Sequence, residues 1–377
     1  MRTLKDVNIN GLRVLLRVDY NVPVDENGNI LDDFRIKKSL PTIKYILKQA
    51  KQLIIMSHLG RPKGKFIKQY TMDKVAIRLM KYLGRNVVKV DDSANAIIPD
   101  DKIVLLENLR FHKEEKENDE EFAKKLASHA DVFVNDAFAV CHREHASVVG
   151  VTKFLPSCAG FLIQEEVENL DLTSAEKPLM VIMGGAKLST KFPMMNSLIP
   201  KVDKILLGGA MIFSFYKAQG LEIGDSLCEE DQIVTARLLA NNEKIVLPKD
   251  IVVATEINEK AEFKTVPVNR IPKKWIGLDL GVETMNDFKK ILKKAKTVFW
   301  NGPLGYYEIE HFAESTYGMA KFLAGLKARV IIGGGDSASV IEKLNLRSEF
   351  SHVSTGGGAS LEFIQNNTLL GLEVLKN

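Results

Sequence analysis

Short apolar runs recur along this chain, and the residues that follow them change in kind halfway along the sequence. In the first half the runs end in polar and cationic residues, which are Arg17, Asp19, Asn21, Ser57, His58, Arg61, Glu107, Asn108, Arg110, His112, Asn135, Asp136, His142 and Arg143. In the second half they end in glycine turns, at 184–185, 208–209, 301–303, 333–335 and 356–358. Open parallel sheets bind ligands beyond the carboxyl ends of their strands. We therefore expect two ligand-binding edges, one for a small anion and one for a phosphorylated ligand.

The spacing of these runs predicts an α/β fold. Helical patterns lie between the runs, at 72–83, 120–129 and 231–239, which indicates repeated βα units and mainly parallel sheets. A chain of 377 residues is long enough for two domains of roughly 100–200 residues each. A helical pattern within 158–174 leads into a new strand, so we expect the boundary there. The prediction is two Rossmann-like domains joined by a hinge helix, with a cleft between them.

Composition and charge exclude several classes of protein. The net charge is only +4 and no basic stripe is interleaved with aromatic residues, so we expect no nucleic-acid partner. Cys141, Cys158 and Cys228 form no CxxC pair, which favours a reduced, cytoplasmic protein. The N-terminus lacks an apolar signal core, and no apolar run approaches the roughly 18 residues of a membrane span, so we expect no membrane partner. The charged run 113–121 is interpreted as a solvated helix face.

The glycine turns of the second half are suited to phosphate, because a backbone without Cβ can approach it closely and a following helix offers free N–H groups. Ordinary tight turns also use glycine, and spacing alone leaves that alternative open. No P-loop motif and no initial GxGxxG occurs, which excludes both standard nucleotide fingerprints. Asp336 follows a glycine turn and is either a helix N-cap or a ligand for Mg²⁺. Lys187 and Lys191 are four residues apart, so a helix would place both on one face.

The cations of the first half are suited to carboxylate and phosphate. Arginine and histidine supply forked or ring N–H donors at Arg35, His58, Arg61, Arg110 and Arg143. Asp19 and Asn21 would accept from a substrate hydroxyl or orient the arginines. The alternative is that these arginines are solvated surface residues, as most are. Adjacent Cys141 and His142 suggest a nucleophile, but a Cys–His dyad is built from residues that meet in space rather than in sequence.

Ten motifs extend this pattern over almost the whole chain. They are 17–23 (RVDYNVP), 32–36 (DDFRI), 57–62 (SHLGRP), 106–112 (LENLRFH), 135–138 with 142–143 (NDAF and HR), 184–187 (GGAK), 208–210 (GGA), 300–303 (WNGP), 333–336 (GGGD) and 354–359 (STGGGA). In this order they resemble the motifs of the phosphoglycerate kinase family.

The resemblance implies reversible, Mg²⁺-dependent transfer of a phosphoryl group from 1,3-bisphosphoglycerate to ADP, which gives 3-phosphoglycerate and ATP in glycolysis and gluconeogenesis. It implies a phosphoglycerate-binding domain at 1–163, a nucleotide-binding domain at 164–360, and a C-terminal segment, 361–377, that packs back on the first domain. By similarity the phosphoglycerate is bound by Asp19, Asn21, Arg35, His58, Arg61, Arg110 and Arg143. The nucleotide would be bound by Lys187, Lys191, Gly281, Asn301, Glu308, Gly334, Gly335, Asp336 and Ser337, with Asp336 as the metal ligand. We also expect a monomer, and Arg35 and Lys187 as the catalytic pair.

The residues fit this chemistry, because the acceptor oxygen is already ionised at pH 7 and needs no general base. The chain departs from the commoner family pattern at 139–140, at 164–165, at 306–307 and at Ser337.

Two other classes of function remain. One is a different α/β transferase that uses an acyl phosphate or a nucleotide, against which the phosphoglycerate residues argue. The other is a catalytically silent binding protein, which should have lost Arg35, Lys187 or Asp336.

Overall fold

The chain folds into two units, each built on a parallel sheet. The computed structural model describes residues 1–376. The first unit comprises Met1–Glu168 with the C-terminal segment from Thr368, and the second comprises Asn169–Asn367. The sequence predicted limits after 163 and after 360, whereas the structure divides the chain a few residues later at both places. Residue 377, the end of the predicted C-terminal segment, lies outside the described residues.

The sheet of the first unit has six strands in the order β3-β4-β2-β1-β5-β6, and every neighbouring pair runs parallel. The strands are β1 (Arg13–Val18), β2 (Gln52–Met56), β3 (Val88–Lys89), β4 (Ile103–Leu105), β5 (Val132–Asp136) and β6 (Ser157–Ala159). The helices are α1 (Phe34–Leu47), α2 (Asp73–Leu83), α3 (Glu114–Glu117), α4 (Glu120–Ser128) and α13 (Leu370–Glu373). This arrangement confirms the predicted parallel α/β fold.

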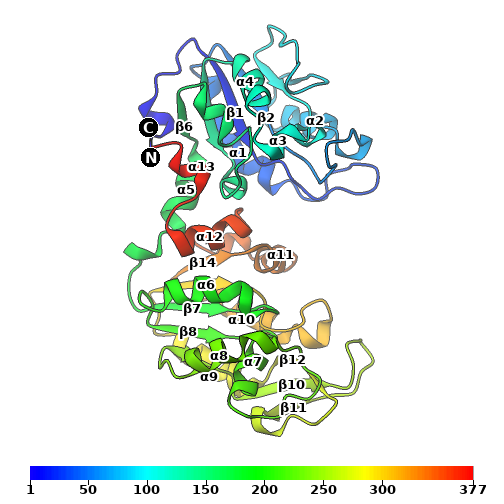
Figure 1. Cartoon of the computed structure of the whole chain (residues 1–377), viewed down its shortest axis with the longest axis vertical. Coiled ribbons are helices and arrows are strands. Elements are labelled where there is room, and N and C mark those ends of the chain that lie inside the picture. The colour runs from blue at the N-terminus through cyan, green and yellow to red at the C-terminus, as the bar shows by residue number, and fades with distance from the viewer. Residues whose placement is uncertain (377) are drawn as a thin grey trace. The chain divides into compact units, whose positions relative to one another are not determined.

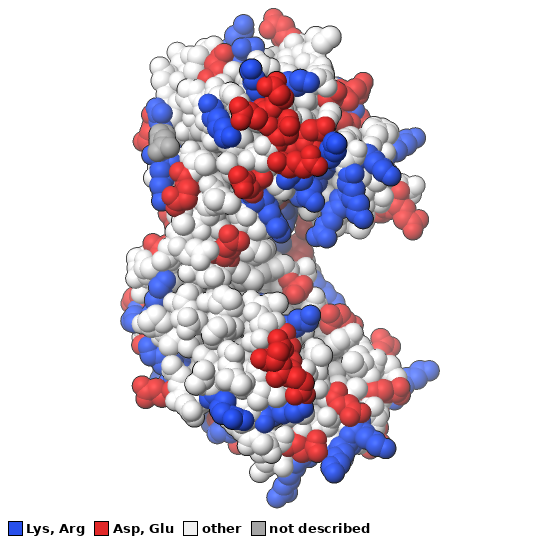
Figure 2. Space-filling view, in the orientation of Figure 1, with Lys and Arg blue, Asp and Glu red and all other residues white. Residues whose placement is uncertain are grey.

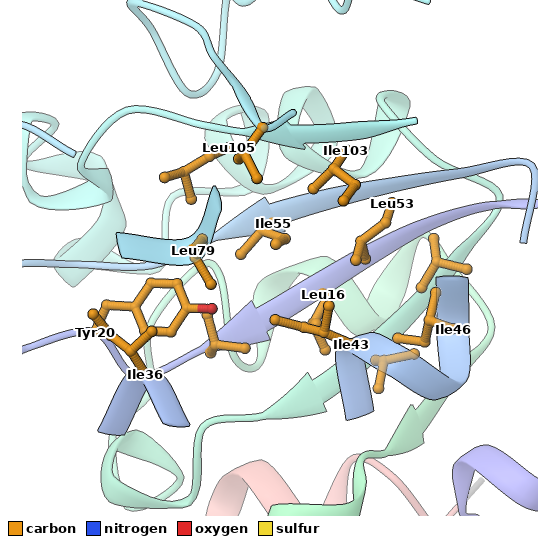
Figure 3. Close-up of a cluster of buried hydrophobic side chains, with 14 of the residues drawn as sticks. Leu16, Tyr20, Ile36, Ile43, Ile46, Leu53, Ile55, Leu79, Ile103 and Leu105 are labelled. Atoms are coloured by element: carbon orange, nitrogen blue, oxygen red, sulfur yellow. The ribbon is translucent and has the colours of Figure 1, made fainter. Parts of the chain in front are cut away.

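The core of the first unit explains why its strands read as continuous apolar runs. Helices pack on both faces of the sheet (Figure 1), so almost every strand side chain is buried. Figure 3 shows Leu16 of β1 and Ile55 of β2 facing Ile36 and Ile43 of α1 in one cluster of buried side chains. The sheet edge beyond these strands is therefore anchored by a packed core.

The second unit contains a parallel sheet of six strands in the order β15-β14-β13-β7-β8-β9. Its strands are β7 (Leu179–Met183), β8 (Lys204–Leu207), β9 (Ile245–Val246), β13 (Thr297–Asn301), β14 (Arg329–Gly333) and β15 (His352–Val353). Beside it lies an antiparallel sheet of β11 (Phe263–Pro267), β10 (Asp250–Ala254) and β12 (Ile276–Leu280), which the sequence analysis did not predict. The helices are α6 (Leu188–Leu198), α7 (Ile212–Ala218), α8 (Ile233–Ala240), α9 (Val282–Leu292), α10 (Glu314–Ala324), α11 (Gly335–Lys343) and α12 (Gly358–Asn366).

Two segments link the units along the chain. Helix α5 (Phe161–Leu170) contains the limit between them, which falls after Glu168. At the other end of the chain, α12 belongs to the second unit and α13 to the first. There the amide of Gly371 donates to the carbonyl of Cys141 at 2.7 Å, and the amide of Arg2 donates to the carbonyl of Leu375 at 3.0 Å.

The predicted helices at 72–83, 120–129 and 231–239 correspond closely to α2, α4 and α8. The interpretation of 113–121 as a solvated helix face was wrong in two respects. Asn118 adopts a left-handed conformation that separates α3 from α4, and the side chain of Glu115 is completely buried. The expectation that a helix carries both Lys187 and Lys191 was also wrong, because Lys187 has an extended backbone and precedes α6.

The surface carries charges of both signs. Figure 2 shows basic and acidic side chains interspersed over the visible face of each unit, without a continuous basic band. Within residues 1–376, no helix has the length and apolar character that crossing a membrane requires.

Candidate functional site

Polar side chains gather at the carboxyl edge of the first sheet. Asp19 follows β1, His58 follows β2, Arg110 follows β4, and Arg143 follows β5. Arg35 lies in the first turn of α1. Parallel strands end at one edge of their sheet, so the fold brings together residues that are more than a hundred positions apart in the sequence.

Asp19 is the centre of the contacts at this edge. Its carboxylate is almost completely buried and pairs with the guanidinium of Arg35. It also accepts from the amide of Asn21 at 3.0 Å, and it lies 4.0 Å from Nδ1 of His58. The side-chain oxygen of Asn21 accepts in turn from the amide of Gly60 at 2.9 Å. Asp19 and Asn21 therefore position the surrounding residues of this edge.

Asn108 and Gly60 hold Arg110 in place. The side-chain oxygen of Asn108 accepts from the amides of Leu59 and Arg110, at 3.1 and 3.0 Å. Nη1 of Arg110 donates to the carbonyl of Gly60 at 2.9 Å, whereas its Nε is buried without a partner among the described residues. A buried N–H donor without an acceptor is costly, so this guanidinium is suited to a ligand oxygen.

The cations at this edge lie close enough to disturb one another. Burial lowers the pKa of Arg110 to about 10, and repulsion from Arg17, Arg61 and Arg143 contributes in the same direction. Burial and the nearby cations Arg17 and Arg110 also lower the pKa of His58 well below its ordinary value. Repulsion among neighbouring cations is relieved by a bound anion, so this edge is suited to an anionic ligand. Arg61 and Arg143 are exposed and accessible to that ligand.

The second unit contains a pocket at the carboxyl ends of its strands. A cavity of about 240 Å³ is lined by residues of the glycine turns, by Leu278 and Leu280 of β12, and by Tyr307, Glu308 and Asp336. Apolar walls with a few polar groups at the rim are typical of small-molecule sites. The antiparallel sheet, which was not predicted, thus supplies one wall through β12.

The side chain of Lys191 lies close enough to Asp336 for their charges to interact. Nζ of Lys191 donates to the side-chain oxygen of Asn301, whose Nδ2 is buried without a partner among the described residues. Burial lowers the pKa of Lys191 to about 8, although the negative charge of Asp336 opposes the shift. Lys187 is exposed at the start of α6.

The glycine turns serve two purposes. A Cβ on Gly184 would lie 1.9 Å from the carbonyl oxygen of Pro303, so that glycine is required by packing alone. A Cβ on Gly335 would meet nothing within 4 Å, so packing does not explain this exposed glycine at the first position of α11. Ser337 is buried and accepts from the amide of Gly302 at 2.7 Å, which ties two turns together. Gly334 has a positive φ and caps α11 without a side-chain hydrogen bond.

Gly281 lies one residue beyond the lining of the pocket. It is the N-cap of α9, and its Cα packs so closely on Asp250 that a Cβ would lie 2.1 Å from a carboxylate oxygen. Its neighbour Leu280 reaches the cavity wall. Packing therefore accounts for the glycine, and its backbone lies at the margin of the pocket.

Asp336 fits a divalent cation that is shared with a phosphorylated ligand. Its exposed side chain lines the pocket at the start of α11, where backbone N–H groups are free for phosphate. In residues 1–376 no group of three His, Cys, Asp or Glu side chains is arranged to hold a metal ion. Mg²⁺ commonly binds through one or two carboxylates together with phosphate oxygens and water, so a single carboxylate at this position is sufficient.

Several residues at the site were not among the predicted ligands. Arg17 was recognised only as a strand-end residue, yet it is completely buried and contacts His58. Glu115, Ser147 and His145 lie behind it. Their positions in the sequence gave no signal, because charged and small polar residues resemble those of any surface loop. Tyr307 lines the second pocket, and the sequence analysis named it only as a departure from the family pattern.

Comparison with known proteins gives one consistent family. The sequence profile described as Phosphoglycerate kinase matches residues 4–367. The chain is 47% identical to the phosphoglycerate kinase of Pelotomaculum thermopropionicum, across 99% of this chain and 98% of that protein. It is 46% identical to that of Synechococcus elongatus, across 100% and 98%. The solved structure of phosphoglycerate kinase from Coxiella burnetii superposes with a TM-score of 0.89 at 38% identity, covering 99% of this chain and 98% of that one.

Proposed function

The chain belongs to the phosphoglycerate kinase family and is a glycolytic phosphotransferase with a carboxyl acceptor. We propose which residues bind each substrate and which act in the transfer. The reaction is the reversible transfer of a phosphoryl group from 1,3-bisphosphoglycerate to ADP. The proposal assigns the phosphoglycerate to the anion site of the first unit and the nucleotide to the pocket of the second.

The first unit would hold the phosphoglycerate through the cations at its sheet edge. Support comes from the buried Nε of Arg110, which has no partner among the described residues, and from the repulsion that Arg17, Arg61 and Arg143 exert on this guanidinium, which a bound anion would relieve. This state of Arg110 is the observation that carries the assignment. Arg35, His58, Arg61, Arg110 and Arg143 would donate to carboxylate and phosphate oxygens, and Asp19 and Asn21 would accept from the hydroxyl and orient Arg35.

The second unit would hold ADP or ATP in the cavity bounded by β12 and the glycine turns. Its apolar wall suits a base, and the free amides at Gly334 and Gly335 suit phosphate. Lys187, Lys191 and Asn301 would contact phosphate oxygens, and Glu308 at the exposed rim would contact the ribose. Ser337 and Gly281 would act by shaping the backbone around the ligand.

Asp336 would hold Mg²⁺ together with the nucleotide phosphates. When it is bound, this ion would neutralise negative charge on the phosphates, as metal ions do in phosphoryl transfer generally. The protein side chains supply the remaining positive charge.

Transfer itself requires alignment rather than a base. An oxygen of the ADP β-phosphate attacks the phosphorus of the acyl phosphate, and the bond from that phosphorus to the carboxyl oxygen breaks. Both the attacking and the leaving oxygen are ionised at pH 7, so no proton moves. Arg35 and Lys187 would stabilise the charge that spreads over the transferred group.

Because the two ligands would be held by different units, the reaction requires the units to close on each other. We propose α5, which contains the limit between the units, as the hinge. Small-angle scattering would show a smaller radius of gyration with both ligands than with either alone. A ternary complex no smaller than the free protein would remove the hinge from the proposal.

The decisive experiment is a coupled assay of the purified protein with 3-phosphoglycerate and ATP, with and without Mg²⁺. Activity that needs all three supports the whole assignment, and binding without turnover would indicate a silent relative. Arg35, Lys187 and Asp336 are all present, which favours turnover. We also propose a cytoplasmic monomer. The three cysteines are unpaired, which suits a reducing compartment, and sedimentation would measure the oligomeric state.

A further inference from the structure

A buried network lies directly behind the anion site. It consists of Glu115, Ser147, Arg17 and His58, and the first three have no exposed surface. Glu115 belongs to α3, Ser147 to the loop after β5, and Arg17 to β1, so three separate parts of the first unit meet here. None of these three was assigned a role in the reaction above.

Each hydrogen bond in the network has a fixed direction. The carboxylate of Glu115 accepts from the amide of Ser147 at 3.0 Å and from its hydroxyl at 2.7 Å. Because the hydroxyl proton is used in this way, the Ser147 oxygen is free to accept from Nε of Arg17, at 2.9 Å. Nη1 of Arg17 donates to the carbonyl of Val18. A serine that donates on one side and accepts on the other thus connects the carboxylate to the guanidinium.

The last contact decides the state of His58. Nη2 of Arg17 lies 3.1 Å from Nδ1 of His58. A guanidinium has donors and no acceptor, so Nδ1 has to be the unprotonated nitrogen. The imidazole is then neutral and carries its single proton on Nε2. The lowered pKa of His58, which is caused first by burial and then by Arg17, agrees with this state.

Glu115 explains how a buried arginine can be kept at this place. An isolated cation in the protein interior is strongly unfavourable, and a carboxylate connected to it through one hydroxyl offsets that cost. The negative charge of Glu115 raises the pKa of Arg17, and the positive charge of Arg17 lowers the pKa of Glu115, so each favours the charged form of the other. Burial favours the neutral form of both groups. Nδ1 of His145 lies 3.7 Å from the same carboxylate, and a protonated His145 would be repelled by Arg17.

We propose that Glu115 and Ser147 are positioning residues that hold Arg17 against His58, so that His58 presents an Nε2–H donor to the bound substrate anion. The proposal rests on the proposed function for the identity of that anion, a phosphorylated hydroxy acid. The neutral Nε2–H donor of His58 has a fixed direction, so it would favour a ligand whose acceptor oxygen lies at one position. The exposed arginines would supply the positive charge that attracts the anion. The network would therefore act on the affinity for phosphoglycerate and not on that for the nucleotide.

The first test needs no substrate. Long-range ¹⁵N–¹H spectra of the intact protein distinguish the two neutral tautomers and the imidazolium of each of its seven histidines. The His58 signals are assigned by their absence in His58→Gln. We expect the Nε2–H tautomer at pH 7. The Nδ1–H tautomer or an imidazolium at His58 would overturn the proposal even if the enzyme proved fully active.

The second test compares buried serines. Ser147→Ala removes the link between Glu115 and Arg17, and Ser93→Ala is the matched control, because Ser93 is equally buried and its hydroxyl has no partner among the described residues. In Ser147→Ala the KM for 3-phosphoglycerate should rise about tenfold, as expected for loss of a hydrogen bond to a charged group. The KM for ATP should not change, and Ser147→Thr should restore the wild-type value.

The outcomes separate the possible failures. Equal KM values for 3-phosphoglycerate in Ser147→Ala and Ser93→Ala would refute the positioning role. A rise in both KM values together with a loss of thermal stability would indicate a purely structural network. If the wild-type protein shows no turnover of 3-phosphoglycerate, the proposed function fails, and the tautomer measurement still decides whether the network sets the state of His58.

Discussion

The two proposed ligand edges would both recognise a phosphorylated anion, but they do so with different parts of the chain. The first unit uses side chains: Arg35 pairs with a buried Asp19, and Arg110 is held by the backbone of Gly60. The second unit relies more on backbone: it has a helix start at Gly334 and closely packed glycine turns, with the exposed side chain of Asp336 beside them. The first edge is a network of buried charges, whereas the second is a cavity with charges at its rim.

This difference has a physical reason in what each edge would bind. A three-carbon acid offers few apolar contacts, so its affinity has to come from charge-assisted hydrogen bonds. A nucleotide offers a flat base that an apolar wall can bury, and its phosphates are suited to amides at a helix start. Substitutions should therefore act through side-chain charge in the first unit, and through backbone geometry as well as side-chain charge in the second.

The largest effect should come from the residues that would act on the transferred group itself. Arg35→Ala and Lys187→Ala should each lower kcat by about 10²–10³-fold, because fixed cations stabilise charge that develops in the transition state. The KM for the ligand of the other unit should change much less. Steady-state kinetics with both substrates at saturation measures this. Near-normal kcat in either variant would reduce that residue to a ground-state contact.

Asp336→Asn should have the next largest effect. The amide keeps an oxygen at the start of α11 but loses the negative charge that attracts Mg²⁺. We expect kcat/KM for Mg-ATP to fall by about 10–100-fold, in the range of one lost interaction with a charged group. Titration of activity with Mg²⁺ measures the metal requirement, and calorimetry measures the affinity for 3-phosphoglycerate as a control. An unchanged Mg²⁺ requirement would exclude Asp336 as the metal ligand.

The two edges also differ in how far sequence alone predicts them. Strand-end residues such as Asp19 and His58 could be assigned to one edge because parallel strands end together, and the structure gathers them there. The turns at Gly184 and Gly335 look alike in sequence, but packing requires only the first. That distinction depends on the carbonyl of Pro303, which is distant in sequence, so no local pattern could reveal it.

Glu115 shows that local sequence also fails to predict which charged residues are buried. It lies in a run of charged residues and was assigned to a solvated face, yet it is completely buried. Its burial depends on Ser147, 32 residues further along the chain, which donates to both carboxylate oxygens. The antiparallel sheet was missed for a related reason, since most residues of its outer strand β11 are exposed and show no clear alternation. Local periodicity cannot predict partners that only the tertiary fold supplies.

A matched pair of glycine substitutions tests the backbone character of the second edge. Gly184→Ala should lower stability by about 1–3 kcal/mol, the usual cost of forcing extra atoms into a packed region, because its Cβ would overlap Pro303. Gly335→Ala should leave the melting temperature almost unchanged and raise the KM for ATP several-fold, because the methyl group would keep the phosphates away from the amides. Thermal unfolding and kinetics of both variants separate the two roles. A normal KM for ATP in Gly335→Ala would show that the phosphates do not approach this helix start.

The smallest expected effect concerns pH. Burial lowers the pKa of Lys191 to about 8, so the side chain is charged at pH 7 and largely neutral at pH 9. An anionic nucleotide binds the charged form better, so the KM for ATP should rise about three- to tenfold over this interval, within the limit of tenfold per pKa unit. Lys191→Arg stays charged throughout and should show a flat profile, whereas Lys191→Met should show a flat profile with a high KM. At the first edge the pKa of His58 lies well below its ordinary value and that of Arg110 is about 10, so neither group changes charge near pH 8 and the KM for 3-phosphoglycerate should stay constant. A rise in both KM values would place the titrating group outside the second edge and contradict this role of Lys191.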